Sequence, residues 1–386
     1  MKQSSAIDRR TFLKLGSAGV AGALSINRLA AAAEEGTAPI GGVTPVYRTL
    51  GRTGMKVTVV SIGAMRTSES AVLRAAFDRG VNYVDTARGY MGPGVNEAIV
   101  GEAVKGIRDK LYVATKFSPL GTKEEIIQSC EDSLVSLGLD YVDLLQAHCP
   151  PPEYIQQDHV REALTQLQQD GKIRFKGITT HKDEVACVNA VVDDPEKLFD
   201  TALVVYNFES GPEIREAIAR AAEAGIGIIA MKTQAGGYEK EALGGVTPHQ
   251  AALKWVLADE HVTCAVPAMV DLAQVEEDTA VMNLMAMTAA EAQVLRRYAE
   301  AIEGDWCHRC GVCERACPKG VDIRDVNRCV MYAEGYRDLR LARENYARIA
   351  PERSLAACGD CAACTLRCVH GIDLPNRVAR ARTLFA

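Results

Sequence analysis

The sequence predicts an α/β protein, a (β/α)8 TIM barrel followed by a small all-α domain. Two observations predict this architecture. Short apolar runs alternate with amphipathic segments eight times between residues 56 and 269, and eight of the thirteen cysteines form two tight groups after residue 306. Parallel strands that are buried on both faces are apolar along their length, and eight strand–helix units make a TIM barrel. A doubly wound sheet is the alternative, but no Gly-x-Gly-x-x-Gly follows the first predicted strand.

Composition excludes several classes of protein. The chain has 386 residues, of which 48% are hydrophobic and 24% charged, and its net charge is −6. These values are those of a globular protein and argue against a disordered chain or a basic nucleic-acid-binding protein. Beyond the N-terminal segment, no apolar run approaches the roughly 18 residues that span a bilayer. We therefore expect no nucleic-acid partner and no stable membrane span in the mature protein.

Residues 1–33 have the features of an export signal. Arg9 and Arg10 are followed by Phe-Leu-Lys, a Gly- and Ala-rich apolar stretch and four alanines that end at Ala33. This pattern resembles the twin-arginine (Tat) signal, whose pathway carries folded proteins. It predicts cleavage near Ala33 and a periplasmic or otherwise extracytoplasmic protein. An amphipathic helix with an incidental arginine pair is the alternative.

The barrel is expected to occupy residues 46–300. A hairpin over 47–56 is expected to cap its lower end. The eight predicted strands cover residues 57–64, 81–87, 111–117, 141–148, 175–181, 202–208, 227–233 and 264–269. Helices are predicted between them, for example over 123–137, 160–169 and 214–224. Several helical segments end in glycine, the usual residue at a left-handed helix stop.

Four polar residues lie at or just beyond the predicted carboxyl ends of strands, where a TIM barrel carries its chemistry. Asp85, Lys116 and His148 end strands, and Tyr90 follows Asp85 in the next loop. A phenol has a pKa near 10 and is a poor acid at neutral pH, so it needs a neighbouring cation that stabilises its phenolate. Lys116 could supply this charge, and Asp85 could hold Lys116 in place. His148 could polarise a substrate carbonyl. The alternative is that Asp85 and Lys116 form only an ion pair at the barrel mouth. Tyr90 and His148 would then take no part in the chemistry.

The segments around these residues resemble the aldo-keto reductases. The matching stretches are residues 80–90, 114–116, 143–148, 177–181, 206–208 and 227–232, and the resemblance covers about residues 46–300. It implies carbonyl–alcohol chemistry in which Tyr90 is the general acid for reduction and the general base for oxidation. It also implies a nicotinamide cofactor, with contacts from Gly63, Thr179, Thr180, Met231, Gln274, Glu277 and Asp278.

This chain departs from the family at the cofactor positions. Leu203 stands where a glutamine usually binds the carboxamide, and Met231 stands where an aromatic residue stacks on the nicotinamide. The segment 265–278 contains no Lys or Arg, although a 2′-phosphate needs a cation. We therefore expect NAD(P) with NAD favoured, or a non-standard electron source.

Two cysteine quartets repeat one spacing near the C-terminus. The pattern Cys-x-x-Cys-x-x-Cys-x-x-x-Cys is that of bacterial ferredoxins, which bind two [4Fe–4S] clusters, and residues 317–323 match 368–374 as an internal repeat. The fourth cysteine of each quartet ligates the other cluster in such proteins. We therefore assign Cys307, Cys310, Cys313 and Cys368 to one cluster, and Cys358, Cys361, Cys364 and Cys317 to the other. Two structural zinc ions are the alternative.

Residues 304–386 resemble an all-helical dicluster ferredoxin-like domain. The segment between the quartets is charged and helical in pattern, a helix over 287–302 is expected to connect it to the barrel, and Trp306 is expected to pack at the junction. The domain carries 14 Lys and Arg against 10 Asp and Glu, a net charge of +4. This charge suits either an acidic electron-transfer partner or compensation of the cluster charge, and both interpretations stay open.

Together these features predict an exported oxidoreductase that interconverts a small carbonyl compound and an alcohol and transfers electrons through two clusters. A hydride carries two electrons, whereas a [4Fe–4S] cluster transfers one at a time. Direct coupling of the barrel to the clusters therefore needs a mediator between two-electron and one-electron transfer, and nicotinamide does not readily act as one. The alternative is a redox-sensing or electron-transfer subunit with a catalytically weak barrel, as in the potassium-channel β-subunit branch of the family. The intact set of Asp85, Tyr90, Lys116 and His148 argues against it.

Overall fold

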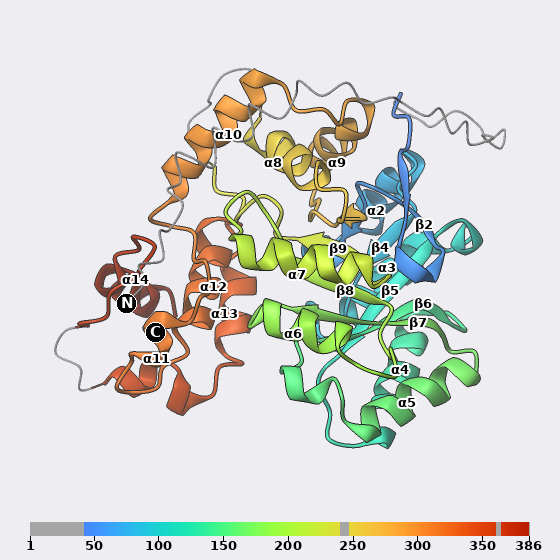
Figure 1. Cartoon of the computed structure of the whole chain (residues 1–386), viewed down its shortest axis with the longest axis horizontal. Helices are drawn as coiled ribbons and strands as arrows, with labels where there is room; N and C mark the ends of the chain where they lie inside the picture. Colours follow the sequence, from blue (N-terminus) through green and yellow to red (C-terminus); the bar gives the residue numbers. More distant parts are fainter. Residues whose placement is uncertain (1–41, 240–246, 360–363, 386) are drawn as a thin grey trace. The chain divides into compact units, whose positions relative to one another are not determined.

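The structure is a computed structural model that describes residues 42–239, 247–359 and 364–385 (Figure 1). The export signal expected over 1–33 and the expected cluster ligand Cys361 lie outside the described residues. The described residues belong to one compact unit, which contains both the barrel and the C-terminal helices. Within the described residues, no helix is both long and apolar enough to cross a membrane.

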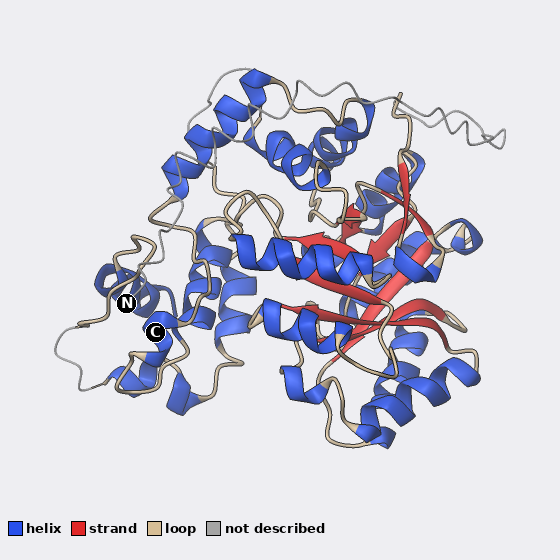
Figure 2. Cartoon of the chain, viewed as in Figure 1, coloured by secondary structure: helices blue, strands red, loops and turns tan. Residues whose placement is uncertain are grey.

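Eight parallel strands form the barrel, and each pairs with the next along the chain (Figure 2). They are β3 (Ile62–Gly63), β4 (Tyr83–Asp85), β5 (Tyr112–Phe117), β6 (Val142–His148), β7 (Ile173–Thr180), β8 (Thr201–Val205), β9 (Gly227–Met231) and β10 (Cys264–Ala265). A parallel bridge between Val60 and Ala265 closes the ring, and the amide of Gly63 donates to the carbonyl of Pro267 at 2.9 Å. The predicted TIM barrel is confirmed.

The hairpin below the barrel corrects one predicted strand. Strands β1 (Tyr47–Thr49) and β2 (Lys56–Thr58) pair antiparallel, so the start of the strand expected over 57–64 belongs to the hairpin. The apolar character of Val57 has a different cause from the one expected. Val57 packs with Leu50 and Met55 in the cluster that also holds inward-facing residues of the barrel strands. Burial at the barrel floor therefore gives this segment the same pattern as a barrel strand.

Eight helices follow barrel strands and surround the sheet (Figure 2). They are α2 (Ser70–Asp78), α3 (Val95–Val104), α4 (Lys123–Leu137), α5 (Asp158–Gln169), α6 (Glu184–Val192), α7 (Pro212–Glu223), α8 (Pro248–Leu257) and α9 (Leu272–Thr279). Helix α4 has the bounds that the sequence predicts: a capping box of Thr122 and Glu125 starts it, and Gly138, with φ of 63°, ends it.

The C-terminal residues form helices, and no strand occurs in the described part of 304–386. Helix α10 (Ala289–Ile302) connects the barrel to α11 (Val312–Arg315), α12 (Ile323–Glu334), α13 (Leu339–Tyr346) and α14 (Leu374–Phe385). Trp306 is buried in a cluster that joins barrel residues such as Val205 to Met331 and Tyr332 of α12. The junction is therefore a packed interface, and it brings α12 to the barrel.

Candidate active site at the barrel mouth

A buried ion pair lies at the carboxyl ends of two neighbouring strands. Asp85 ends β4 and Lys116 lies near the end of β5, and both side chains are almost completely buried. The Lys116 ammonium donates to the Asp85 carboxylate and to the carbonyl of Thr86 at 2.6 Å. Gln146 of β6 donates to the second carboxylate oxygen at 2.7 Å. These contacts fix the charged group of Lys116 in one position.

Tyr90 and His148 complete the group that the sequence predicts. The Lys116 ammonium lies 4.7 Å from the centre of the Tyr90 ring. The rings of Tyr90 and His148 meet edge to face with centroids 5.8 Å apart. Pairing of β4, β5 and β6 in register places the three strand ends side by side. The structure thus brings all four predicted side chains together.

The protonation states differ from the sequence expectation at Tyr90. Burial, and then the charge of Asp85, raise the pKa of Tyr90 well above its usual value. The positive charge of Arg328 opposes this increase in the pKa of Tyr90. Burial, followed by Lys116 and three further cations, lowers the pKa of His148 to about 3. At neutral pH the phenol is therefore protonated and the imidazole neutral, a combination suited to a proton donor beside a neutral hydrogen-bond donor.

A cavity of about 430 Å³ extends from these residues toward the start of α9, within the usual range for a ligand site. Asp85 and Tyr90 line one end. Its wall includes five residues predicted for the cofactor, and also Leu203, which stands at the family's glutamine position. The five are Gly63, Met231, Gln274, Glu277 and Asp278.

Thr179 and Thr180, the other two predicted cofactor contacts, do not line this cavity. The hydroxyl of Thr179 accepts from the amide of Cys149 at 3.2 Å, and that of Thr180 donates to the carbonyl of Lys182 at 2.6 Å. Both hydroxyl groups are thus engaged by the loops that follow β6 and β7. The assignment of these two residues to the cofactor stays a prediction.

Cations from distant segments line the cavity and were missed by the sequence reasoning. The segment 265–278 carries none, as expected, but Arg66 and Arg337 border the same cavity. The Arg66 guanidinium stacks on the ring of Tyr336 at 4.6 Å and donates to the carbonyl of Tyr336 at 2.7 Å. Since Tyr336 and Arg337 follow α12, the C-terminal region forms part of the cavity wall. No local pattern in the sequence indicates this contact.

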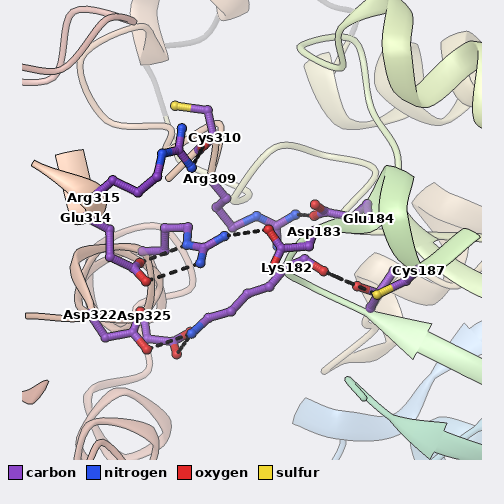
Figure 3. A network of polar contacts seen from close by, with 12 residues as sticks. Lys182, Asp183, Glu184, Cys187, Arg309, Cys310, Glu314, Arg315, Asp322 and Asp325 are labelled. Carbon is purple, nitrogen blue, oxygen red and sulfur yellow. Dashed lines mark hydrogen bonds and ion pairs between the residues drawn. The ribbon is translucent and has the colours of Figure 1, made fainter. Parts of the chain in front are cut away.

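Ion pairs attach the C-terminal region to the loop that follows β7 (Figure 3). Lys182 pairs with Asp322 at 2.6 Å and with Asp325 at 2.7 Å. The neighbouring loop residue Asp183 pairs with Arg324 at 3.2 Å. Glu184 pairs with Arg309 between the first two cysteines of the first quartet. Since this loop leaves the carboxyl end of a barrel strand, the contacts hold α12 over the barrel mouth.

A cysteine–histidine pair lies next to the four predicted residues. The Cys149 sulfur is 2.9 Å from Nδ1 of His181, and His181 lines the large cavity. The rings of His181 and His148 are 6.5 Å apart. Burial raises the pKa of the Cys149 thiol, so the thiol is protonated at neutral pH. The position of Cys149 after His148 is the only local signal for this pair in the sequence.

The cysteines of the first quartet lie close to Cys368 of the second. Burial, and then the charges of Cys307, Cys368 and Cys310, raise the pKa of Cys313 to about 11. These are the four residues that the sequence assigns to one cluster. No disulfide joins two of the described cysteines. Within the described residues, no three His, Cys, Asp or Glu side chains lie close enough to hold a single metal ion.

The structure describes three of the four cysteines that the sequence assigns to the second cluster. Cys317, Cys358 and Cys364 border the same apolar cluster, which contains Leu355 and Leu366. Cys361, the fourth residue assigned to this group, lies outside the described residues. The quartets therefore share one helical core, which is the arrangement needed for exchange of their fourth cysteines.

Comparisons with known proteins agree on the barrel. A sequence model of the aldo/keto reductase family matches residues 60–242. L-galactose dehydrogenase from Arabidopsis thaliana is 35% identical over 154 residues, which are 34% of this chain and 47% of that protein. Methylglyoxal reductase YeaE from Escherichia coli is 27% identical over 257 residues, covering 61% of this chain and 86% of that protein. The chain spans about half the length of the first curated relatives that it matches.

A solved structure gives the same result for the fold. The aldo/keto reductase from Klebsiella pneumoniae in complex with NADP and acetate is 25% identical, with a TM-score of 0.57. The match covers 66% of this chain and 96% of the Klebsiella chain. An eight-stranded parallel barrel, the family sequence match and four polar groups at the strand ends agree with one another. Over residues 60–242 the barrel of this chain is similar to the aldo-keto reductases.

Proposed function

We propose that this protein is an oxidoreductase that interconverts a small carbonyl compound and the corresponding alcohol at the barrel mouth. The observation that carries the proposal is the buried pair of Asp85 and Lys116 beside Tyr90 and His148, next to a ligand-sized cavity. The alternative, a redox-sensing or electron-transfer subunit with a weak barrel, has less support because the four groups lie together.

The four residues divide the chemistry between them. His148, which is neutral, donates a hydrogen bond to the carbonyl oxygen of the substrate and orients it. Tyr90 donates its proton to that oxygen as the carbon is reduced, and Lys116 stabilises the phenolate that results. Asp85 holds Lys116 in position throughout. In alcohol oxidation, the Tyr90 phenolate accepts the proton, so this direction is favoured at alkaline pH.

The cavity fits a nicotinamide dinucleotide. Three buried polar atoms on its wall have no partner among the described residues: Oε1 of Glu277, Oγ1 of Thr233 and Nε2 of His249. Arg66 and Arg337 could approach a pyrophosphate, and Glu277 could accept hydrogen bonds from a ribose hydroxyl. When bound, the nicotinamide would supply or accept the hydride. The solved structure of the Klebsiella relative is a complex with NADP.

We expect NAD to bind this chain at least as tightly as NADP. Gln274, Glu277 and Asp278 line the cavity where the family commonly binds the 2′-phosphate, and they offer no positive charge. Changing Glu277 to Arg should tighten NADP about tenfold, because one charge-assisted hydrogen bond contributes about 1.5–3 kcal/mol. Titration of both nucleotides at matched ionic strength, followed by protein fluorescence, measures the two values of Kd.

Glu276→Arg is the matched control, because Glu276 is exposed on the same helix and does not line the cavity. It makes the same change in net charge and should leave the ratio of the two Kd values unchanged. Tenfold tighter binding of NADP to the unmodified protein would contradict the expected preference. In that case Arg66 or Arg337 would be the source of the missing charge.

The C-terminal region is proposed to hold two [4Fe–4S] clusters. The proximity of Cys368 to the first quartet supports this, and the donor set is thiolate throughout. Two further groups suit sulfur ligands: Nδ2 of Asn327 lies 3.6 Å from the Cys307 sulfur, and the amide of His370 lies 3.4 Å from that of Cys368. Such clusters would supply one-electron transfer to a partner, with a mediator needed between them and a hydride.

Anaerobically purified protein should contain about eight iron atoms per chain, as two cubane clusters require. Cys310→Ser and Cys364→Ser should each remove about half of the iron, since each change takes one ligand from a different cluster. Iron analysis and visible absorption measure the loss. Cys130→Ser is the control, because Cys130 is buried in α4 of the barrel and should not affect iron. Stoichiometric zinc with little iron would favour the structural zinc sites instead.

Export through the twin-arginine pathway is proposed from residues 1–33. Changing both Arg9 and Arg10 to Lys should retain the folded protein in the cytoplasm, because the pathway recognises the arginine pair. Cell fractionation followed by immunoblotting measures the distribution. Arg28→Lys, which leaves the pair intact, should be exported normally. Unchanged delivery of the double variant would show that a different signal acts.

A further inference from the structure

A second histidine lies at the candidate active site, beside the four predicted residues. His181 directly follows β7 and lines the large cavity, as Tyr90 does. Its ring centre lies 6.5 Å from that of His148, and the two rings are tilted by 48°. The proposed reaction gives the His181 side chain no role, although it lies on the wall that a substrate would contact.

Cys149 occupies one nitrogen of the His181 ring. Its sulfur lies 2.9 Å from Nδ1, and Nε2 has no hydrogen-bond partner among the described residues. Burial, followed by neighbouring cations, lowers the pKa of His181 well below its usual value, so the ring is neutral at neutral pH. A neutral imidazole carries its proton on one nitrogen, and the hydrogen bond at the other nitrogen decides which one. The direction of the hydrogen bond to Cys149 therefore determines what Nε2 can do.

Thr179 determines the direction of that hydrogen bond. The Cys149 amide donates to the carbonyl of Thr179 at 2.9 Å and to its hydroxyl oxygen at 3.2 Å. The Thr179 hydroxyl still has its own proton to donate, and the Cys149 sulfur, 3.7 Å away, is its one acceptor among the described residues. Since the sulfur accepts from Thr179 and the thiol is protonated, the thiol donates its own proton to Nδ1. The imidazole proton then lies on Nε2, which becomes a hydrogen-bond donor for a ligand in the cavity.

We propose that His181 donates a hydrogen bond to a second oxygen of the substrate, next to the carbonyl group, and that Cys149 is its positioning residue. The substrates are then carbonyl compounds with a hydroxyl or oxo oxygen on the adjacent carbon. This inference rests on the proposed function, in which Tyr90 and His148 bind the carbonyl oxygen itself. Hydrogen bonds of about 2.9 Å from the two imidazoles can meet two neighbouring oxygens of one small molecule across the 6.5 Å between the ring centres.

A donor at this position makes the site selective. When a bound substrate places an apolar group against Nε2 of His181, the donor loses its hydrogen bond with water and gains none in return. The site therefore favours a substrate with an oxygen at this position over one with a methyl group of similar size. The aldehydes 2-hydroxypropanal and 2-methylpropanal differ in this one group. The ratio of their kcat/KM values therefore measures the contribution of His181.

Steady-state reduction of the two aldehydes by the full chain, with NADH or NADPH supplied, tests the proposal. His181→Phe keeps an aromatic ring and removes the donor, so the ratio of kcat/KM for the hydroxy over the methyl compound should fall about tenfold. His181→Gln supplies an amide donor and should recover part of the ratio. His261→Phe is the matched control, because His261 lies between α8 and β10 and does not line the cavity. Absence of turnover of both aldehydes by the unmodified protein would overturn the proposed function, whereas turnover with an unchanged ratio in His181→Phe would overturn this inference alone.

Variants of Cys149 test the positioning of the ring. Cys149→Ala removes the donor to Nδ1, so the ratio of kcat/KM should fall toward that of His181→Phe, whereas Cys149→Ser keeps a donor and should retain the ratio. A merely structural role would lower kcat/KM for both aldehydes and leave their ratio unchanged. Nitrogen-15 NMR of the full chain with labelled histidine measures the tautomer directly, and the His181 signal is identified by its loss in His181→Phe. We expect a neutral ring protonated on Nε2, and protonation on Nδ1 would overturn the proposal.

Discussion

Changing Tyr90 to Phe should lower kcat for carbonyl reduction by about 10²–10⁴-fold, the usual contribution of a general acid. The ring and its packing against Lys116 and His148 are kept, so only the proton donor is lost. Affinity for the nicotinamide should change little, because the tyrosine hydroxyl is assigned to the substrate oxygen. Steady-state kinetics with a panel of small aldehydes, together with nucleotide titration, separates the two effects.

The dependence of the rate on pH provides an independent measurement. Because the pKa of Tyr90 is raised well above its usual value, the phenol stays protonated through the neutral range. Reduction by the unmodified protein should therefore be level there and decline only at strongly alkaline pH, whereas alcohol oxidation should increase with pH. Tyr47→Phe, an exposed change in the hairpin, should leave both profiles intact. A Tyr90→Phe rate within tenfold of the original would mean that another group donates the proton.

Changing Lys116 to Met should destabilise the fold as well as remove activity. The Asp85 carboxylate would be left buried without its cation, and breaking a buried pair in this way costs about 3–5 kcal/mol. Gln146 would remain as a single neutral donor to Asp85. Urea unfolding measures the loss of stability, and kinetics with the same aldehydes measures the loss of turnover.

The double variant Asp85→Leu with Lys116→Met separates the two losses. It removes both charges, so stability should largely return, because an apolar pair can replace a buried ion pair at little cost. Turnover should not return, since the phenolate would still lack Lys116. If Lys116→Met alone does not fold, the effect of removing Lys116 on turnover can still be measured in the double variant. A loss below about 1 kcal/mol in the single variant would contradict the burial described for this pair.

The barrel could be predicted from the sequence because its strands are buried on both faces. Continuous apolar runs at regular intervals are a direct result of that burial. The same physics explains the error over 57–64. Val57 is buried under the barrel floor and therefore has the same apolar character as a barrel strand, although it pairs in the hairpin. Apolarity alone does not distinguish these two positions.

The strand-end residues could be predicted because register fixes them. Asp85, Lys116 and His148 lie on consecutive parallel strands, so their sequence positions determine their places at one end of the barrel. The pKa of Tyr90 could not be predicted in this way. Its direction depends on the balance between burial and Asp85, which raise the pKa, and Arg328, which lowers it, and that balance is set by distances in the folded protein.

The contribution of the C-terminal region to the site left no local signal in the sequence. Tyr336 and Arg337 line the cavity only because α12 docks on the loop after β7. Docking of this kind depends on complementary charges about 140 positions apart, such as Lys182 and Asp322. A periodic pattern indicates which face of a helix is buried, but it does not identify the surface that covers that face.

Docking within one chain has a consequence for how the mouth is covered. Because α10 connects the C-terminal helices to the barrel, the pairs of Lys182 with Asp322 and Asp325 form within one chain, and their formation does not depend on the concentration of the protein. Contacts that are individually weak can then keep the mouth covered at any dilution of the protein.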